Sequence, residues 1–306
     1  MAFDRLEAMR AFCRIVEVGS FTGAAAALNM AKTTISGQIQ GLESLLGVKL
    51  LHRTTRRVTP TTDGAAYYER ARSVLDDLDE LEASIAQSRS VARGRVRVEM
   101  PSGVGSCLII PALPGFTALH PQIQLDIGCS ERVVDLVQEG IDCAFRGGLV
   151  ADQGLVCRPV GQMRFCLCAS PAYLSNSPPL RKPDDLQQHR YLGFTFPGSG
   201  KQLTPVLRRG DESFTVDQSP AMRFNHGGAY LTAGLAGLGI VSVPLAEASP
   251  HFQAGALVEV LPGWSPGSMP ISLVYPYARH LSARVRVFAD WAAALMADDP
   301  LWTLKG

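Results

Sequence analysis

Apolar side chains fall at helical spacing along the first part of the chain, and residues 20–46 carry the clearest pattern. Ser20 is a residue type that caps helices, and the alanines at 24–27 favour a short helix after it. Asn29 and Met30 then predict a brief turn. The helix expected beyond this turn has one apolar face, formed by Ile35, Ile39, Leu42 and Leu46. The stretch therefore predicts two short helices joined by a tight turn.

The opposite face of the second helix carries small and hydrogen-bonding side chains: Thr33, Ser36, Gly37 and Gln40. This pattern is typical of a helix-turn-helix, whose second helix enters the DNA major groove and reads base edges with its outer face. An ordinary pair of helices with a solvated face gives the same pattern, so the hairpin alone leaves both interpretations open. The flanking residues decide between them.

The residues before the hairpin predict another helix. It begins at Asp4, with Glu7 in its first turn, because carboxylates are favourable at a helix N-terminus. It ends at Gly19, a residue that commonly terminates helices. We expect its core-facing side chains to be Leu6, Met9, Phe12, Cys13 and Val16.

The residues after the hairpin form a short, basic, strand-like segment, His52–Thr59. Arg53, Arg56 and Arg57 lie in it, as expected of a wing that follows DNA phosphates. Residues 1–60 hold eight lysines and arginines against four acidic residues, whereas the whole chain has a formal net charge of only +1. Basic charge is thus concentrated beside the candidate reading helix, which favours nucleic acid as the partner. A solvated basic loop is the alternative.

A long helix is predicted next, capped at Thr61–Gly64 and ending at about Ser88. Its apolar residues have heptad spacing: Tyr67, Ala71, Val74, Leu78, Leu81 and Ile85. Acidic residues form an outer face that would repel DNA: Asp76, Asp77, Asp79, Glu80 and Glu82. We expect this helix to pair with a second copy, because two reading helices one DNA turn apart can bind a partly palindromic site. An intramolecular contact is the alternative.

Residues 91–306 alternate strand and helix patterns and are long enough to bury a core of their own. Strands are expected at 94–100, 122–128, 141–146, 163–169, 240–243 and 271–275, and helices at 133–139, 225–237 and 283–297. This alternation predicts a parallel, doubly wound sheet. We expect the strand at 163 to begin a second lobe and the strand at 271 to return the chain to the first.

Ligands of such sheets bind beyond the carboxyl ends of the strands, near helix N-termini. The residues that this rule places in a cleft are Ser102, Gly103, Ser130, Arg146, Thr195, Asn225 and His226. Hydroxyl groups and helix N–H groups suit a carboxylate, and Arg146 could add charge or brace the sheet. We therefore expect a small organic anion as ligand, although each residue taken singly also fits a turn or a cap.

Composition restricts the other possibilities. Hydrophobic residues make up 46% and charged residues 19% of the chain, and no run of about 18 consecutive apolar residues occurs, so we expect neither a membrane-spanning helix nor a membrane partner. The first residues lack an apolar signal core, so a cytoplasmic location is expected. The seven cysteines should then be reduced. Cys166 and Cys168 could form a thiol switch, but buried small hydrophobic side chains explain the cysteines better.

The chain resembles the LysR-type transcriptional regulators along its whole length. The segment FTGAAAALNMAKTTISGQIQGLESLLGVKLLHRTTRRVTPTTDG is similar to the family's N-terminal signature, and the similarity continues through GRVRVEMPSGVG, FTALHPQIQLDIG, DCAFRGG and GLAGLGIVSVP. The resemblance implies a mixed α/β chain: a winged helix-turn-helix at 1–60, a dimerising linker helix at 61–90, and a two-lobed effector domain at 91–306 similar to periplasmic binding proteins. Lobe I would span about 91–162 and 270–306, and lobe II about 163–269. It also implies a homodimer, commonly a homotetramer, that binds double-stranded DNA.

The family's DNA contacts carry over onto four residues of this chain: Lys32, Thr33, Ser36 and Arg56. The same two elements add further candidates for DNA binding: Thr34, Gln38, Gln40, Arg53 and Arg57. Two positions depart from the family pattern. Gly37 stands where members usually have arginine, and Ala31 stands where they usually have a serine cap. Each change costs about 1 kcal/mol of helix stability.

Enzyme motifs are incomplete in this chain. Gly198–Lys201 is similar to a phosphate loop, but Thr195 and Gln202 occupy positions that need glycine and serine or threonine. The glycines at 234, 237 and 239 have the wrong order for a dinucleotide site. No zinc-type ligand spacing is present. We therefore expect no enzyme activity, cofactor or metal. A small-molecule binding protein or enzyme whose N-terminal part serves only assembly is the second functional class.

Overall fold

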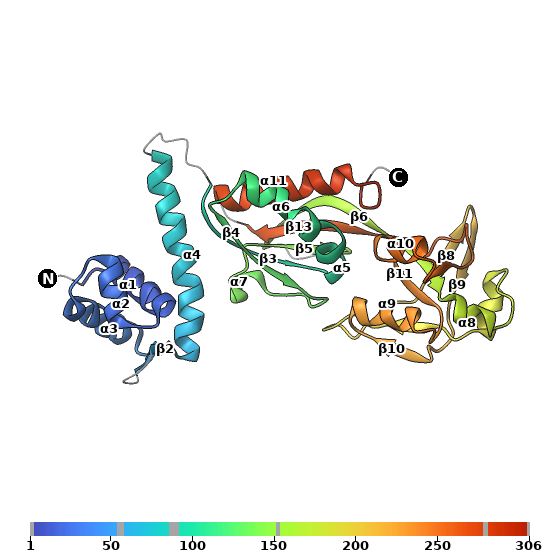
Figure 1. Cartoon of the computed structure of the whole chain (residues 1–306), viewed down its shortest axis with the longest axis horizontal. Helices are drawn as coiled ribbons and strands as arrows, with labels where there is room; N and C mark the ends of the chain where they lie inside the picture. Colours follow the sequence, from blue (N-terminus) through green and yellow to red (C-terminus); the bar gives the residue numbers. More distant parts are fainter. Residues whose placement is uncertain (1–2, 54–57, 86–91, 151–153, 278–280, 305–306) are drawn as a thin grey trace. The chain divides into compact units, whose positions relative to one another are not determined.

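The computed structural model describes residues 3–53, 58–85, 92–150, 154–277 and 281–304, and it divides into two units, Met1–Arg95 and Val96–Gly306 (Figure 1). The elements of the N-terminal unit are α1 (Arg5–Val18), α2 (Phe21–Leu28), α3 (Lys32–Leu46), β1 (Leu51–Arg53), β2 (Val58–Pro60) and α4 (Thr62–Ile85). The expected sequence of three helices, a two-stranded ribbon and a long helix is therefore confirmed.

Local capping fixes where the first two helices begin and end. The Asp4 carboxylate accepts hydrogen bonds from the backbone N–H groups of Leu6 and Glu7 at 2.8 and 3.1 Å. Gly19 ends α1 in the left-handed conformation, with φ of 72°. The Ser20 hydroxyl then accepts from the N–H of Gly23 at 2.9 Å and starts α2. These boundaries agree with the sequence prediction because they depend only on neighbouring residues.

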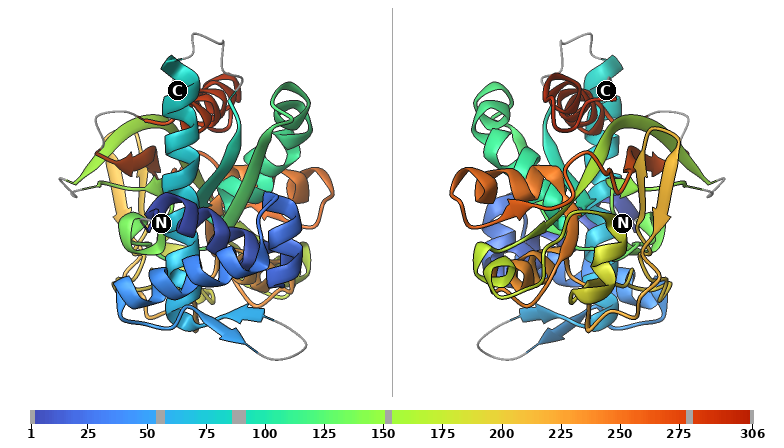
Figure 2. Two further views of the ribbon diagram at one scale, coloured as in Figure 1. Left: turned by 90° about the vertical axis from the view of Figure 1, so that its left-hand side faces the viewer. Right: turned by 90° about the vertical axis from the view of Figure 1, so that its right-hand side faces the viewer.

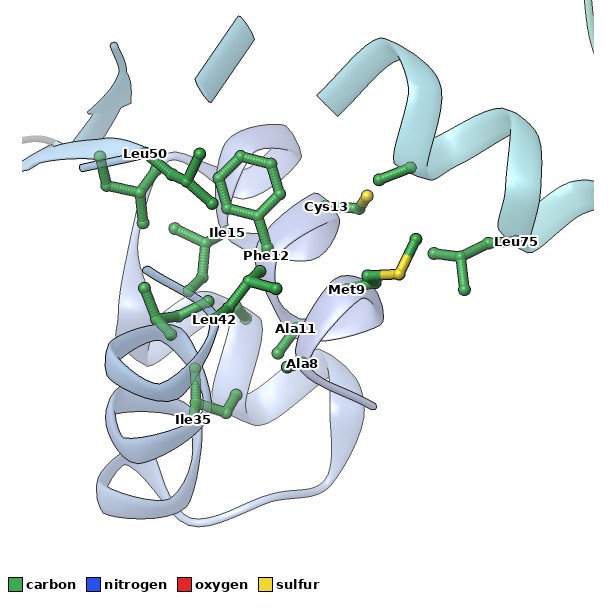
Figure 3. Close-up of a cluster of buried hydrophobic side chains, with 14 of the residues drawn as sticks. Ala8, Met9, Ala11, Phe12, Cys13, Ile15, Ile35, Leu42, Leu50 and Leu75 are labelled. Atoms are coloured by element: carbon green, nitrogen blue, oxygen red, sulfur yellow. The ribbon is translucent and has the colours of Figure 1, made fainter. Parts of the chain in front are cut away.

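The core of the N-terminal unit forms where α1 contacts both α3 and α4 (Figure 3). Its buried side chains include Ala8, Met9, Ala11, Phe12, Cys13 and Ile15 from α1, Ile35, Ile39 and Leu42 from α3, and Ala71 and Leu75 from α4. The prediction was wrong for Leu6 and Leu46, which are 41% and 39% exposed. They lie in the first turn of α1 and the last turn of α3. The buried surface of α1 is wider than one stripe because two helices cover it.

A buried glutamate occupies the interior near the end of α3. Glu43 is 3% exposed, and its carboxylate accepts hydrogen bonds from the backbone N–H groups of Leu50 and Leu51 at 3.1 and 3.4 Å and from Lys49 Nζ at 2.8 Å. Burial would raise the pKa of Glu43, but these hydrogen bonds outweigh it and lower the pKa below the usual value. Glu43 thereby fastens α3 to the segment that enters the wing.

The start of α4 is fastened to the same segment. The Thr61 hydroxyl donates to the carbonyl of Lys49 at 2.7 Å and accepts from the N–H of Gly64 at 2.9 Å. Gly64 permits this close packing, because a Cβ at that position would lie 1.9 Å from the carbonyl oxygen of Leu50. The chain on both sides of the wing is therefore held to the helical core.

The residues of the predicted heptad face of α4 differ in burial: some pack against α1 and others are exposed. Ala71 is buried together with Leu75 against α1, so assigning Ala71 to a contact between two copies was wrong. Val74 and Leu81 are 50% and 57% exposed. The Ile85 side chain and residues 86–88 lie outside the described residues.

Two acidic residues of α4 form ion pairs within the N-terminal unit. Asp79 forms an ion pair with Arg10 at 2.7 Å, and Asp76 lies 3.6 Å from Arg72, which also pairs with Glu17 of α1. The acidic face is therefore partly neutralised within the unit rather than wholly directed outward.

The second unit is built on one continuous sheet. Its strands follow the order β11-β6-β13-β5-β3-β4, with β12 (Val258–Glu259) also paired to β6. Their bounds are β3 (Gly94–Met100), β4 (Ile123–Cys129), β5 (Cys143–Gly147), β6 (Leu155–Ala169), β11 (Val241–Pro244) and β13 (Ser268–Pro276). β3 and β5 are parallel, as expected. A wholly parallel sheet was the wrong expectation, because β13 runs antiparallel to both β5 and β6.

The long strand β6 joins two lobes (Figures 1 and 2). Its residues 155–164 pair with β13 in lobe I, and its residues 165–169 pair with β11 and β12 in lobe II. β6 thus begins well before residue 163, where the sequence pattern placed its start. The lobes share a backbone ladder rather than a flexible linker.

In lobe I, an apolar helical stretch and the final helix α11 (Ala283–Asp298) lie side by side on the sheet (Figure 1). The stretch comprises α5 (Ser102–Val104), a π-helical turn (Gly105–Ile109) and α6 (Ile110–Leu119). The buried Phe116 ring lies 5.7 Å from Phe288 and 4.8 Å from Trp291. The stretch is long and apolar enough to cross a membrane by composition, but helices that contribute to a protein core meet the same criterion. α7 (Leu136–Glu139) is shorter than expected.

Lobe II contains several short elements that the sequence patterns did not reveal. They are α8 (Pro171–Ser175), a 3₁₀ helix (Pro183–Gln188), β7 (Leu192–Phe194), β8 (Val206–Arg209), β9 (Glu212–Thr215), β10 (Met222–Phe224) and α10 (Leu245–Gln253). The predicted glycine-rich helix is α9 (Gly227–Leu235). Its Gly234 packs closely on β11, since a Cβ there would lie 2.8 Å from the Val241 side chain.

The buried Glu43 carboxylate makes a testable contribution to stability. Replacement of Glu43 by Gln should lower the free energy of unfolding near neutral pH by about 1–3 kcal/mol, because a charged acceptor of two backbone N–H groups is lost. The lowered pKa of Glu43 supplies stability above its unfolded-state pKa, and this stability is lost as the pH falls through the folded-state value. The difference between wild type and variant in urea unfolding should therefore shrink in acid. A difference that is independent of pH, or equal to that of the exposed control Glu82→Gln, would contradict this role.

Candidate nucleic-acid interface and interlobe cavity

The outer face of α3 is polar and accessible. Lys32, Thr33, Thr34 and Gln40 are exposed, and Ser36 is half-buried. Within the described part of the chain, Thr33, Ser36 and Gln40 make no hydrogen bond to another protein side chain or to the backbone beyond the helix's own ladder. Three of the α3 side chains expected at DNA therefore have hydrogen-bonding groups without a protein partner. Such groups can exchange water for base edges or phosphates at little cost.

Gln38 belongs to the candidate set but has a different environment. Its Nε2 atom donates a hydrogen bond to the Glu7 carboxylate of α1 at 2.8 Å. Gln38 therefore braces α3 against α1 in this structure. The sequence spacing alone could not distinguish it from the exposed glutamine Gln40.

The wing is a short antiparallel ribbon in which Leu51 pairs with Pro60 and Arg53 pairs with Val58 (Figure 2). Its loop, with Arg56 and Arg57, lies outside the described residues, and so does the side chain of Arg53. The described strands establish that the residues on either side of this loop pair as an antiparallel ribbon after α3.

The two departures from the family pattern have visible local consequences. Ala31 precedes α3 without a side-chain hydrogen bond to the helix N-terminus. Gly37 is exposed, and a Cβ at this position would have no neighbouring atom within 4 Å. A larger side chain could therefore occupy position 37 without disturbing the fold.

A cavity of about 380 Å³ lies between the two lobes of the second unit. This volume is within the range of small-molecule sites. Of the residues expected in a cleft, Gly103, Ser130 and Arg146 line it. Thr195 instead lines a separate cavity of about 220 Å³ in lobe II. Ser102, Asn225 and His226 are not among the lining residues of either cavity.

Asn225 and His226 are exposed at the start of α9. His226 caps that helix, because its Nδ1 atom accepts a hydrogen bond from the N–H of Ala229 at 3.3 Å. The structure therefore gives His226 the cap role that was the alternative to ligand binding.

The interlobe cavity is walled mainly by apolar and aromatic side chains that the strand-end rule did not select. They include Met100, Phe145, Met163, Phe165, Phe194, Phe196, Leu203, Tyr230, Val243 and Met269. Several of them lie within strands, where the sequence pattern predicts that apolar residues belong to the core. Only the contact between lobes shows that these residues face a cavity.

The two arginines in the lining are already engaged by the protein. Arg146 donates to the carbonyl oxygen of Val134 at 2.6 Å, so it braces the loop before α7. Arg132 forms a two-point ion pair with Glu139 at 2.6 and 2.9 Å. The positive charge of Arg132 is thus neutralised by Glu139, whereas Arg146 has no carboxylate partner among the described residues and its Nε atom is buried without a hydrogen bond.

Three carboxylates also line the cavity: Glu99, Glu131 and Glu247. None of them forms an ion pair or a side-chain hydrogen bond in the described part of the chain. Burial raises the pKa of Glu247 to about 7, and the negative charge of Glu131 adds to this effect. The charged part of the cavity lining is therefore dominated by carboxylates.

The cysteines of the described chain are all unpaired thiols. Cys143, Cys166 and Cys168 are buried. Burial raises the pKa of Cys107, Cys129 and Cys143, and it raises that of Cys13 to about 12. Thiols with raised pKa values are poor nucleophiles at neutral pH, which favours the packing interpretation over a thiol switch.

One enzyme-like spacing stands in a different structural context from the one that its chemistry needs. The spacing G-x-S-x-G, a feature of some hydrolases, occurs at Gly263–Gly267. Ser265 lies there between β12 and β13, not on a strand-to-helix turn, and its backbone pairs with Arg208. Among the described residues there is also no group of three or more His, Cys, Asp or Glu side chains that could hold a metal ion.

Comparison with known proteins covers both units. Residues 6–65 match the family described as bacterial regulatory helix-turn-helix protein, lysR family, and residues 89–297 match the LysR substrate binding domain. The chain is 38% identical over 301 residues to the HTH-type transcriptional regulator YhjC of Escherichia coli (strain K12), an alignment that covers 96% of this chain and 99% of that protein.

Two further relatives extend the comparison. The HTH-type transcriptional repressor PA14_22550 of Pseudomonas aeruginosa (strain UCBPP-PA14) is 38% identical over 301 residues, covering 97% of this chain and 94% of the relative. The solved structure of CrgA, a LysR-type transcriptional regulator from Neisseria meningitidis, matches with a TM-score of 0.59 and 30% identity over 94% of this chain and 97% of that one. The chain therefore belongs to the LysR family of transcriptional regulators, with a helix-turn-helix DNA-binding region followed by an effector-binding domain.

Proposed function

We propose that this regulator reads its operator with the outer face of α3 and uses the interlobe cavity to sense a small molecule. The observation that carries the proposal is the division of α3 into two faces. Ile35, Ile39 and Leu42 are fully buried, whereas Thr33, Ser36 and Gln40 offer unbonded polar groups on the other side. The basic wing follows directly, so phosphate contacts and base contacts would come from adjacent elements.

The proposed assignment of regions follows the family. Residues 1–60 would bind DNA, residues 61–90 would form the dimerising linker, and residues 91–306 would bind the effector, with lobe II at about 163–269. The candidate DNA contacts are Lys32, Thr33, Thr34, Ser36, Gln38, Gln40, Arg53, Arg56 and Arg57. Gln38 is the weakest of them, because its amide already bonds Glu7.

We also propose that the chain acts in the cytoplasm as a homodimer or a homotetramer and has no enzyme activity. The relatives above are named as regulators, which supports a binding function. The exposed apolar residues of α4, Val74 and Leu81, support association through this helix, because apolar side chains at heptad spacing are commonly covered by a second helix.

Replacement of Ser36 by Ala should separate specific from general DNA binding. The loss of one hydrogen-bonding hydroxyl should weaken binding to the DNA upstream of the chain's own gene by about 1 kcal/mol, or roughly fivefold. Binding to a scrambled duplex should not change, and the melting temperature should not fall, because alanine favours helix more than serine does. Fluorescence anisotropy with both duplexes measures this. Equal weakening on the two duplexes would remove Ser36 from base readout.

Position 37 offers a matched pair of variants. Gly37→Ala should stabilise α3 by about 1 kcal/mol through helix propensity alone and leave DNA affinity nearly unchanged. Gly37→Arg places a guanidinium on the exposed face and should tighten DNA binding and steepen its salt dependence by about one charge. If the two variants bind DNA equally, the α3 face at residue 37 does not approach the duplex.

Replacement of Leu81 by Glu tests association through α4. A buried charge at an apolar helix interface is unfavourable, so the variant should dissociate to smaller species in sedimentation velocity at concentrations where the wild type remains associated. The exposed neighbour Glu82→Gln is the control and should sediment like wild type. Unchanged association of the Leu81 variant would exclude this face as the interface.

A further inference from the structure

Two carboxylates occupy places in the interlobe cavity where a bound anion would be expected. The Glu247 carboxylate, in the first turn of α10, lies so close to Gly103 that a Cβ on Gly103 would be 2.0 Å from Glu247 Oε1. The Glu131 carboxylate lies beside Gly227, the first residue of α9. A Cβ on Gly227 would be 3.3 Å from Glu131 Oε1. The positive end of the α9 dipole is therefore already faced by a charge of the protein.

These carboxylates come from both lobes. Glu99 is on β3 and Glu131 follows β4 in lobe I, whereas Glu247 is on α10 in lobe II. Within the described residues, Glu247 has no hydrogen-bond donor. The titratable groups that interact with it are Glu131, which faces it from lobe I, the thiol of Cys107 on the π-helical turn and the thiol of Cys166 on β6. A partly buried carboxylate beside a second carboxylate is destabilised until a cation or a proton neutralises it.

Neither arginine of the lining acts on Glu247, because only burial and the charge of Glu131 shift its pKa. Arg132 is paired with Glu139, and Arg146 is directed to the carbonyl of Val134. A metal ion is not the expected cation, because the described residues contain no cluster of three metal-ligating side chains. The remaining wall is aromatic, with the Phe194 ring 5.5 Å from Phe196 and 5.6 Å from Tyr230. Aromatic faces attract both apolar groups and cations.

We propose that the interlobe cavity binds a compact molecule with an aromatic or aliphatic body and one positively charged amino group, and that Glu247 and Glu131 hold that group. This inference names the class of effector and so rests on the proposed function. The apolar body would contact the aromatic wall, and the ammonium group would lie between the lobes. Because its two partners belong to different lobes, the amine would also link the lobes.

The test uses three probes of one shape and different charge: 2-phenylethylamine, 2-phenylethanol and phenylacetate. Full-length protein is examined by thermal shift and by calorimetric titration at about pH 8, where Glu247 is ionised. The amine should raise the melting temperature and bind about tenfold more tightly than the alcohol, as one charge-assisted hydrogen bond provides. Phenylacetate should give no shift.

Glu247→Gln is the decisive variant. It should weaken amine binding about tenfold, to the level of the alcohol, and leave alcohol binding unchanged. The exposed glutamate of the same lobe, Glu259→Gln, is the control and should change neither. The ligand-free Glu247→Gln protein should melt higher than wild type at about pH 8 and equally at about pH 4, because a raised carboxyl pKa lowers folding stability only above the unfolded-state pKa.

The outcomes separate this inference from the proposed function. Tighter binding of phenylacetate than of the amine, no response to any of the three probes, or an unchanged amine preference in Glu247→Gln would overturn it. The DNA-binding function fails on a different result, namely that ligand-free wild type does not prefer its own upstream DNA to a scrambled duplex. A protein that passes the DNA assay and fails the amine assay is a regulator with another class of effector.

Discussion

The burial of α1 between α3 and α4 positions the candidate DNA-contacting side chains of α3. Phe12 and Ile15 are fully buried in this contact, and they share one core with Ile35 and Leu42 of α3 (Figure 3). Ile39 of α3 belongs to the same core. Because the apolar face of α3 is occupied in this way, its polar face can only point outward. Glu43 and Thr61 then fasten the backbone before and after the wing to the same core, next to the candidate reading helix.

A comparable constraint shapes the second unit. β6 and β13 extend through the sheet as paired strands, and β6 continues into lobe II. Any relative motion of the lobes must therefore bend or shift this shared ladder, and the walls of the cavity come from both lobes. A ligand that contacts both lobes changes the energy of such motions. This gives a physical basis on which binding in the cavity could alter the activity of another part of the chain.

The sequence predicted what short-range physics determines. The caps at Asp4 and Ser20, the glycine stop at Gly19 and the strand Gly94–Met100 were all predicted at the observed positions. Errors arose where a partner element decides burial. Leu46 has the helical spacing of a core residue, but it is partly exposed, and Glu43 is buried near the end of α3 instead. The Glu43 carboxylate accepts hydrogen bonds from the backbone N–H groups of residues 50 and 51. The heptad spacing predicts that Ala71 faces a second copy, but α1 of the same chain covers it.

The cavity was the least predictable feature. Gly103, Ser130 and Arg146 were found by the rule for strand ends, whereas the carboxylates and aromatic rings were not. Glu131 and Glu247 are far apart in the sequence, and their proximity depends on how the two lobes close. No local pattern distinguishes such a glutamate from a solvated one.

The central claim is that the polar face of α3 distinguishes one DNA sequence from another. The most direct measurement is the ratio of dissociation constants of the wild-type protein for its own upstream DNA and for a scrambled duplex of the same length, at physiological salt. The account predicts a preference of about a thousandfold or more, as in other sequence-specific regulators. Equal affinities, with a steep salt dependence for both duplexes, would show that the basic wing alone binds DNA and would contradict the account.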